Sequence, residues 1–262
     1  MRIVHLSTSD SGGGAFRAAH RLHSGLRRLG HDSRMLVLRK ASTDEHVIPL
    51  RPRQDFIGQW KRKRRARRIW RDYEQYRSTL PTDIEPFSDC RSPSVELVNQ
   101  LPDCDIINLH WVGGLLDHPS FFARYPKHVP LVWRMADMGT MTGGCHYTQG
   151  CAKFTNANGC NECPQLGSRM DGDLSKLNWV WKDAALKKNV GPGGLHIVGP
   201  SRWIAGEAKR SSLLGGFPIS VIPNGLDVEE FSPRDKDFCR DLWNIPRDAN
   251  VILFAAESVA NV

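Results

Sequence analysis

The sequence lacks any apolar run that approaches the ~20 residues a membrane-spanning helix requires. It also lacks a secretion leader, because the first residues, MRIVHLST, read as a β-strand and not as a basic stretch followed by an apolar segment and a cleavage site. Its seven cysteines fit a reducing cytosol better than a disulfide framework. These absences indicate a cytoplasmic protein, either free or peripheral at the inner membrane.

Acidic residues are missing from one segment, Lys61 to Arg71, which holds eight basic residues. This number equals the formal net charge of +8, so the rest of the 262-residue chain is close to neutral. Trp60 and Trp70 stand beside and within the segment. It is either a solvated helix face or a surface attracted to anionic lipid. We expect no nucleic-acid binding, because no aromatic platform or recognition helix accompanies the run.

Short apolar runs alternate with helical patterns along the chain, and most runs are apolar throughout, as in strands buried on both faces. This alternation predicts an α/β fold with a doubly wound parallel sheet. The predicted helices cover residues 15–29 and 56–76, and a polar connector covers 231–246. The predicted strands cover residues 2–7, 33–38, 105–109, 129–135, 195–198, 219–222 and 250–256.

A glycine-rich turn follows the first predicted strand and precedes the first helix. Gly13 and Gly14 lie in this turn, and Arg17 follows where a G-x-G-x-x-G pattern would have its third glycine. Consecutive glycines let backbone N–H groups approach a phosphate, and the helix N-terminus adds partial positive charge. The position favours a ligand loop in which Arg17 adds charge for a diphosphate. The alternatives are a tight turn that merely needs glycine and a solvated arginine.

Two polar residues stand at the carboxyl ends of predicted strands. His110 follows the strand at 105–109, and Asp137 follows the strand at 129–135. Open α/β sheets bind ligands at this edge, so His110 is a candidate substrate contact and Asp137 a candidate sugar ligand or catalytic base. Each has a structural alternative, because His110 can be a satisfied structural residue and Asp137 a helix N-cap or turn carboxylate.

Four cysteines lie within a Gly/Asn-rich segment, Thr142 to Leu166, that has neither helical nor strand periodicity. The segment therefore reads as an irregular loop held by something other than a core. A structural zinc site would order such a loop, and the closing C-x2-C spacing suits metal binding, with His146 as a substitute ligand. Free buried thiols, disulfides and an iron–sulfur cluster are the alternatives. The predicted metal ligands are Cys145, Cys151, Cys160 and Cys163.

Five segments taken together resemble the N-terminal half of a family 4 glycosyltransferase, of the subgroup found in bacterial exopolysaccharide and lipopolysaccharide gene clusters. They occur in the family's order and cover nearly the whole chain. The segments are HLS with GGGAFRAAHRL, NLHWVGG, VWRMADMGTMTGGCHY with the cysteines that follow it, VGPSRWIA and VIPNGLDVEEFSP.

The resemblance implies a GT-B architecture, in which two Rossmann-like domains face each other across a cleft. It implies a retaining transfer of sugar from a nucleotide-diphosphate sugar to a growing surface glycan or lipid-linked acceptor, with no catalytic metal. Gly13 and Gly14 would face the donor diphosphate, and His110 and Asp137 would line the acceptor side. Residues 1–225 would form the acceptor-side domain, with the cysteine-rich loop as an insertion, and 226–262 the hinge and first strand of the donor domain.

Two departures from the family pattern matter. Many relatives have a His-Asp pair where this sequence has Ala136-Asp137, so the sugar-contacting role passes to Asp137 or His110, or is lost. The donor domain stops after its opening strand, so we expect an incomplete half that is inactive alone, with a separately encoded donor domain as a partner. The alternative is a non-catalytic module, derived from such an enzyme, that binds glycan, lipid or a partner.

Overall fold

The computed structural model describes residues 1–80, 87–191 and 193–253. The chain divides into two compact units, Met1–Pro223 and Asn224–Val262, whereas the sequence predicts the boundary after residue 225. No described helix combines the length and apolar character needed to cross a membrane.

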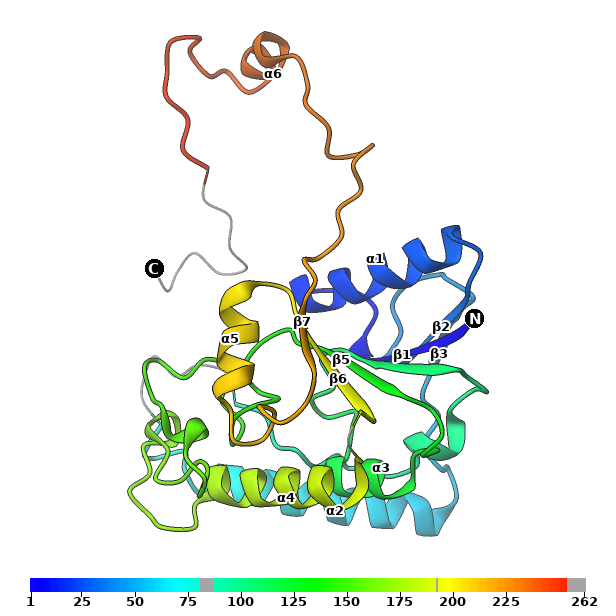
Figure 1. Ribbon diagram of the computed structural model, residues 1–262, viewed down its shortest axis with the longest axis vertical. Coiled ribbons are helices and arrows are strands. Elements are labelled where there is room, and N and C mark those ends of the chain that lie inside the picture. Colours follow the sequence, from blue (N-terminus) through cyan, green and yellow to red (C-terminus); the bar gives the residue numbers. More distant parts are fainter. Residues whose placement is uncertain (81–86, 192, 254–262) are drawn as a thin grey trace. The chain divides into compact units, whose positions relative to one another are not determined.

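The first unit is built on a seven-stranded sheet in which all neighbouring strands are parallel, in the order β3-β2-β1-β4-β5-β6-β7 (Figure 1). This confirms the predicted α/β fold with a doubly wound parallel sheet. The strands are β1 (Arg2–Ser9), β2 (Asp32–Arg39), β3 (Val47–Pro49), β4 (Ile106–Leu109), β5 (Leu131–Arg134), β6 (Leu195–Gly199) and β7 (Ile219–Val221).

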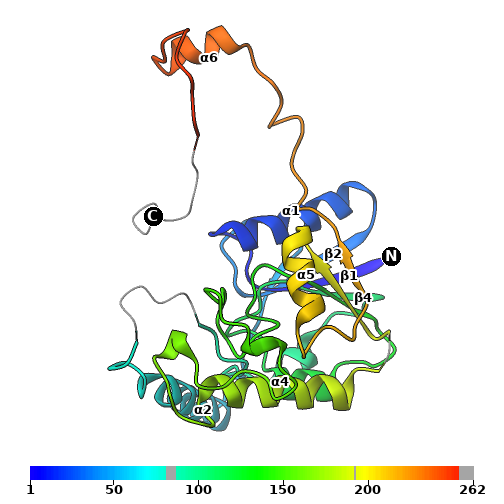
Figure 2. The same cartoon turned by 60° about the vertical axis from the view of Figure 1, so that its left-hand side comes forward.

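Helices cover both faces of this sheet. Two helices, α1 (Gly14–Arg28) and α5 (Arg202–Arg210), lie on one face, while α3 (His118–Arg124), α4 (Leu174–Asn189) and α2 (Phe56–Glu74) lie on the other (Figures 1 and 2). Short 3-10 turns occupy Leu97–Gln100, Lys153–Thr155 and Pro164–Leu166. The segment from 142 to 166 is otherwise irregular, as the sequence predicts.

The core explains why the strands could be read from the sequence. Leu6, Ile107, Leu131 and Ile197 are fully buried between the two helical layers, so their strands are apolar on both faces. Strand order reverses between β1 and β4, because the chain builds β1 to β3 outward in one direction and β4 to β7 in the other. Ligands of doubly wound sheets bind at such a switch point, beyond the carboxyl ends of the strands.

Two predictions in the second unit are wrong in part. Residues 231–246 are not merely a connector, because they contain helix α6 (Lys236–Leu242), whose N-cap Asp235 accepts a hydrogen bond from the backbone N–H of Phe238. Residues 250–253 form no strand, and Ile252 is 94% exposed. The remainder of the strand predicted at 250–256 lies outside the described residues.

Candidate functional site

A small cavity lies beyond the carboxyl ends of β4 and β5, beside the point where strand order reverses. Its volume is about 40 Å³, and a buried water needs roughly 10–15 Å³, so the cavity admits a hydroxyl group or a few waters but no sugar ring. Both predicted catalytic residues, His110 and Asp137, line it. Other lining residues are Ser88, Trp111, Gly139, His146 and Lys182.

The Asp137 carboxylate is held from three sides. The indole N–H of Trp111 donates to Oδ2 at 2.9 Å, and the backbone N–H of Gly139 donates to Oδ1 at 2.8 Å. The imidazole Nδ1 of His146 lies 3.3 Å from Oδ2. Asp137 is not a helix N-cap, since no helix begins there. It closes a turn and orients two ring systems toward the cavity.

His146 is the residue of this site whose position the sequence analysis did not foresee. It was named only as a substitute metal ligand, whereas its Nε2 forms a 2.8 Å hydrogen bond with Ser88 Oγ while Nδ1 faces Asp137. The ring also packs edge-on against Trp111, with centroids 5.8 Å apart. The imidazole therefore connects a hydroxyl to a carboxylate. Its only sequence signal was its place beside Cys145 in the predicted insertion.

His110 belongs to a buried polar chain that runs inward from the cavity. Its Nε2 lies 2.9 Å from Nδ1 of His5, whose Nε2 lies 3.1 Å from Ser33 Oγ, and Ser33 in turn contacts His23. Burial first, and then the charge of His5, hold the pKa of His110 well below its usual value. Its Nδ1 has no hydrogen-bond partner among the described residues. That atom is the one the ring can offer to a ligand.

The glycine-rich turn lies next to the same site. Gly13 is the N-cap residue of α1 and has no side chain with which to cap the helix. At Gly14 there is open space where a Cβ would stand. Phe16, in the first turn of α1, packs edge-on against Trp111, with ring centroids 5.6 Å apart. Arg17 is exposed at the same helix end. The predicted ligand loop is therefore connected to the Asp137 cluster through the contact between Phe16 and Trp111.

The four cysteines of the loop line one small cavity of about 20 Å³. Burial raises the pKa of Cys145 and Cys163 to about 12 and that of Cys160 to about 11. The backbone N–H of Gly143 donates to Cys160 Sγ at 3.1 Å. All are free thiols, and within residues 1–80, 87–191 and 193–253 no three His, Cys, Asp or Glu side chains are assembled as metal ligands. The zinc site therefore stays a prediction.

The loop is fitted closely against α4. Gly159 has a φ of +72°, and a Cβ there would lie 2.0 Å from the indole ring of Trp179, so only glycine fits. Lys182 of α4 is 3% exposed, and its ammonium donates to the carbonyls of Gly139 at 2.6 Å and Thr142 at 3.0 Å. Burial lowers the pKa of this lysine. Lys182 therefore ties the turn after Asp137 and the start of the cysteine loop to the same helix.

An exposed aromatic pair stands at the same edge of the sheet. Tyr147, the neighbour of His146, stacks on Trp203 with ring centroids 6.4 Å apart and an interplanar angle of 20°. Trp203 is the second residue of α5, the helix that follows β6, and both side chains are about half exposed. Flat, exposed aromatic rings offer apolar area with a polar rim. The sequence analysis did not single out either residue.

No protein-family model matches the sequence. Among curated proteins, the chain is similar to "Putative colanic acid biosynthesis glycosyl transferase WcaC" of Escherichia coli (strain K12). The two are 26% identical over 127 residues, which are 47% of this chain and 30% of the relative. The matched region thus spans about a third of the relative's length. With the parallel α/β fold, this similarity relates the chain to a protein described as a glycosyltransferase.

Proposed function

We propose that this chain is the acceptor-side part of a GT-B glycosyltransferase of family 4, which acts in the synthesis of a bacterial surface polysaccharide. The fold supports this, since a doubly wound parallel sheet is the architecture of each GT-B domain. The similarity to a protein named for colanic acid biosynthesis supports the substrate class. The retaining course of the reaction and the nucleotide-diphosphate sugar donor follow from the family resemblance.

The observation that carries the proposal is the Asp137–His146–Ser88 cluster at the switch-point edge. Many relatives have a His-Asp pair after the strand that corresponds to β5, whereas this sequence has Ala136-Asp137. Here His146, from the cysteine-rich loop, supplies an imidazole to Asp137 instead. In the proposed site this imidazole and Nδ1 of His110 bind and orient a hydroxyl of the acceptor sugar. The cavity volume suits a hydroxyl of that kind.

Other residues have supporting roles in the proposed site. Tyr147 and Trp203 form a platform on which a pyranose ring of the acceptor stacks. Gly13, Gly14 and Arg17 offer backbone N–H groups, helix-terminal partial charge and a guanidinium to the donor diphosphate. We also propose that zinc, bound by Cys145, Cys151, Cys160 and Cys163, orders the loop that carries His146 and Tyr147. Its role would be structural, because four thiolates leave no open coordination position.

Sugar transfer tests the proposal. The complete polypeptide that contains this sequence is incubated with nucleotide-diphosphate sugars and fragments of the host's surface glycan, and products are identified by mass spectrometry. We expect one donor to extend one acceptor. The 262-residue chain is tested alone for acceptor binding by titration calorimetry. A complete polypeptide that transfers no sugar, with a chain that still binds glycan, would support the non-catalytic module instead.

A further inference from the structure

Helix α2 is attached to the domain in an unusual way. It is 19 residues long and has no buried residue. Arg65 anchors it, since Nε donates to the carbonyl of Ser92 at 2.6 Å and the guanidinium pairs with the buried carboxylate of Asp117. Arg62 donates to the carbonyl of Arg53 at 3.0 Å. Polar contacts thus hold most of the helix, and Tyr73 stacks on Phe87 near its C-terminal end. The outer surface of the helix covers nothing in the described part of the chain.

That outer surface carries a regular stripe of aromatic and basic side chains. Phe56, Trp60, Lys63, Arg67 and Trp70 recur at spacings of four and three, so they share one face of the helix. All five are exposed, and Phe56, Trp60 and Trp70 are exposed by 84%, 51% and 61%. Aromatic residues stand at both ends of the stripe and cations between them. Aromatic rings are enriched at the level of lipid headgroups, and basic side chains beside them are attracted to anionic lipid phosphates.

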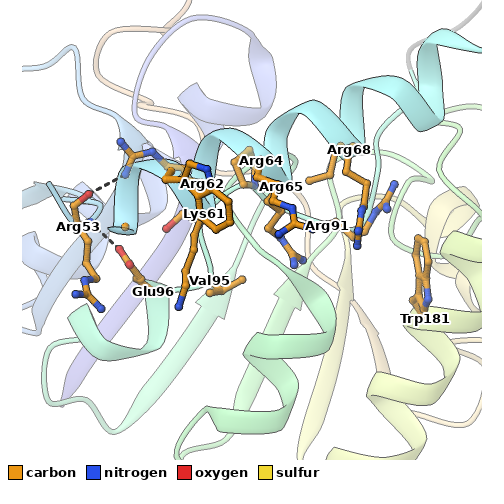
Figure 3. Close-up of a pocket in the computed structure, with 15 residues that line it drawn as sticks. Arg53, Lys61, Arg62, Arg64, Arg65, Arg68, Arg91, Val95, Glu96 and Trp181 are labelled. Carbon is orange, nitrogen blue, oxygen red and sulfur yellow. Dashed lines mark hydrogen bonds between the residues drawn. The ribbon is translucent and has the colours of Figure 1, made fainter. Parts of the chain in front are cut away.

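A basic groove of about 660 Å³ runs beside this stripe, between α2 and segment 91–96, with Trp181 of α4 at one end (Figure 3). Its lining holds seven basic side chains and one carboxylate, that of Glu96. The basic residues are Arg53, Lys61, Arg62, Arg64, Arg65, Arg68 and Arg91.

Some of these cations are neutralised within the chain and others are not. Arg91 pairs with Asp72 at 2.8 Å and Asp89 at 2.6 Å, and its guanidinium lies 4.5 Å from the ring centroid of Trp181. By contrast, Lys61, Arg64 and Arg68 form no ion pair with any carboxylate in the described residues. Figure 3 shows their side chains extending from α2 along the groove. Three such cations in a concave surface favour phosphate groups.

We propose that the stripe and the groove bind the anionic surface of a phospholipid bilayer. The helix would lie parallel to the membrane, with the three aromatic side chains among the headgroups and the groove cations on lipid phosphates. The aromatic ends of the stripe favour this occupant over a double-stranded nucleic acid, which would engage the charges but leave Phe56 and Trp70 in water. A single strand, whose bases can stack on exposed rings, is the competitor in the test below. The inference stands on α2 and the groove beside it and does not depend on the proposed sugar transfer.

Co-sedimentation with vesicles tests the inference. The 262-residue chain is mixed with two kinds of phosphatidylcholine vesicle. One contains no phosphatidylglycerol, and the other contains about 30%, which gives its surface a negative potential. We expect binding only to the anionic vesicles. Each basic residue near such a surface contributes roughly fivefold, so K61Q/R64Q/R68Q lowers the partition coefficient on the order of a hundredfold. F56A/W60A/W70A lowers it on its own without changing the net charge.

The matched control removes three exposed basic side chains from other surfaces, in K188Q/R169Q/R202Q, and has the same net charge as the groove variant. It should sediment with anionic vesicles nearly as wild type does. Inorganic pyrophosphate and a polynucleotide serve as soluble competitors. Equal losses in the two charge variants, no loss in the aromatic variant, or binding to the polynucleotide without binding to vesicles would each overturn the inference. Circular dichroism confirms that every variant is folded.

Discussion

His146 Nδ1 lies 3.3 Å from Asp137 Oδ2, and Nε2 of the same ring hydrogen-bonds Ser88 Oγ. The three side chains come from the turn after β5, the cysteine-rich loop and the segment that precedes β4. The loop is therefore part of the candidate site, since it delivers the imidazole. Anything that disorders the loop will remove His146 from Asp137.

Replacing His146 by alanine should reduce sugar transfer by the complete polypeptide on the order of a hundredfold, the cost of misplacing a substrate by about 1 Å. Asp137→Asn should act in the same direction, because the amide can no longer hold the imidazole through a charged oxygen. Initial rates at saturating donor and varied acceptor measure the effect. His128→Gln, at an exposed histidine, is the control and should match wild type. Full activity in His146→Ala would remove this residue from the site.

Loss of the aromatic pair should weaken acceptor binding while leaving the fold intact. An aromatic stacking contact contributes about 0.5–1.5 kcal/mol, so Trp203→Ala should raise the Kd for a glycan fragment by roughly two- to tenfold. Tyr147→Phe keeps the ring and should have little effect. Titration calorimetry with the 262-residue chain gives both values. Trp243→Ala removes another exposed indole as a control, and an equal loss there would show that the platform is not specific.

The buried histidines make stability depend on pH. Burial lowers the pKa of His5 to about 3 and that of His23 to about 4. Below pH ~6.5 these histidines bind protons in the unfolded chain but stay neutral in the folded protein. The free energy of unfolding is therefore highest above that pH and falls as the pH decreases toward 4. Each histidine contributes about 1.4 kcal/mol per pH unit to this fall.

Urea unfolding at several pH values between 7.5 and 4.5 measures this dependence. His5→Gln should reduce the slope of unfolding free energy against pH, whereas His128→Gln should not change it. A flat profile over this range would show that the buried rings bind protons in the folded state. Burial raises the pKa of Asp44, but hydrogen bonds to His46 and His23 lower it by more, so the net shift is downward. Asp44 therefore adds a loss of stability only at more acidic pH.

Zinc removal should loosen the loop. Protein purified without chelator should contain about one zinc ion per chain, as a four-thiolate site holds. Cys160→Ser should lower this content, and a strong chelator should lower the Tm of wild type more than that of the variant. Cys239→Ser, in α6 and outside the cluster, is the control. Equal metal content in wild type and Cys160→Ser would refute the site, and an iron signal would identify a cluster instead.

The strands could be predicted because burial on both faces leaves an apolar run in the sequence, as at Leu131, Val132 and Trp133 of β5. Helix α4 left a weaker pattern, since its buried face includes the polar residues Asn178 and Lys182. Asn178 accepts a hydrogen bond from the backbone N–H of Cys90, and Lys182 donates to the carbonyls of Gly139 and Thr142. Strand β3 was not predicted, because it has only three residues and pairs with β2 at the sheet edge. Helix α6 was not predicted either, because the polar composition of residues 231–246 indicated a connector. Its local signal in the sequence is the N-cap residue Asp235.

For the candidate site, the positions of His110 and Asp137 followed from a general rule of parallel sheets. The pairing of Asp137 with His146 did not, because it depends on the path of an irregular loop that no periodicity describes. The stack of Tyr147 on Trp203 depends on the same path. The sequence pattern thus predicted the positions of residues at strand ends. The positions of His146 and Tyr147, which the loop carries to the same edge of the sheet, were seen only in the folded structure.

Trp181 and Lys182 are consecutive in α4, yet the first lines the basic groove and the second the cavity beside Asp137. Segment 88–96 is shared in the same way, with Ser88 in the cavity and Arg91 in the groove. Occupants of the two places therefore act on one strip of backbone and one turn of helix. If binding of the proposed lipid surface changes the affinity for the proposed acceptor by some factor, binding of the acceptor must change the affinity for the lipid surface by the same factor.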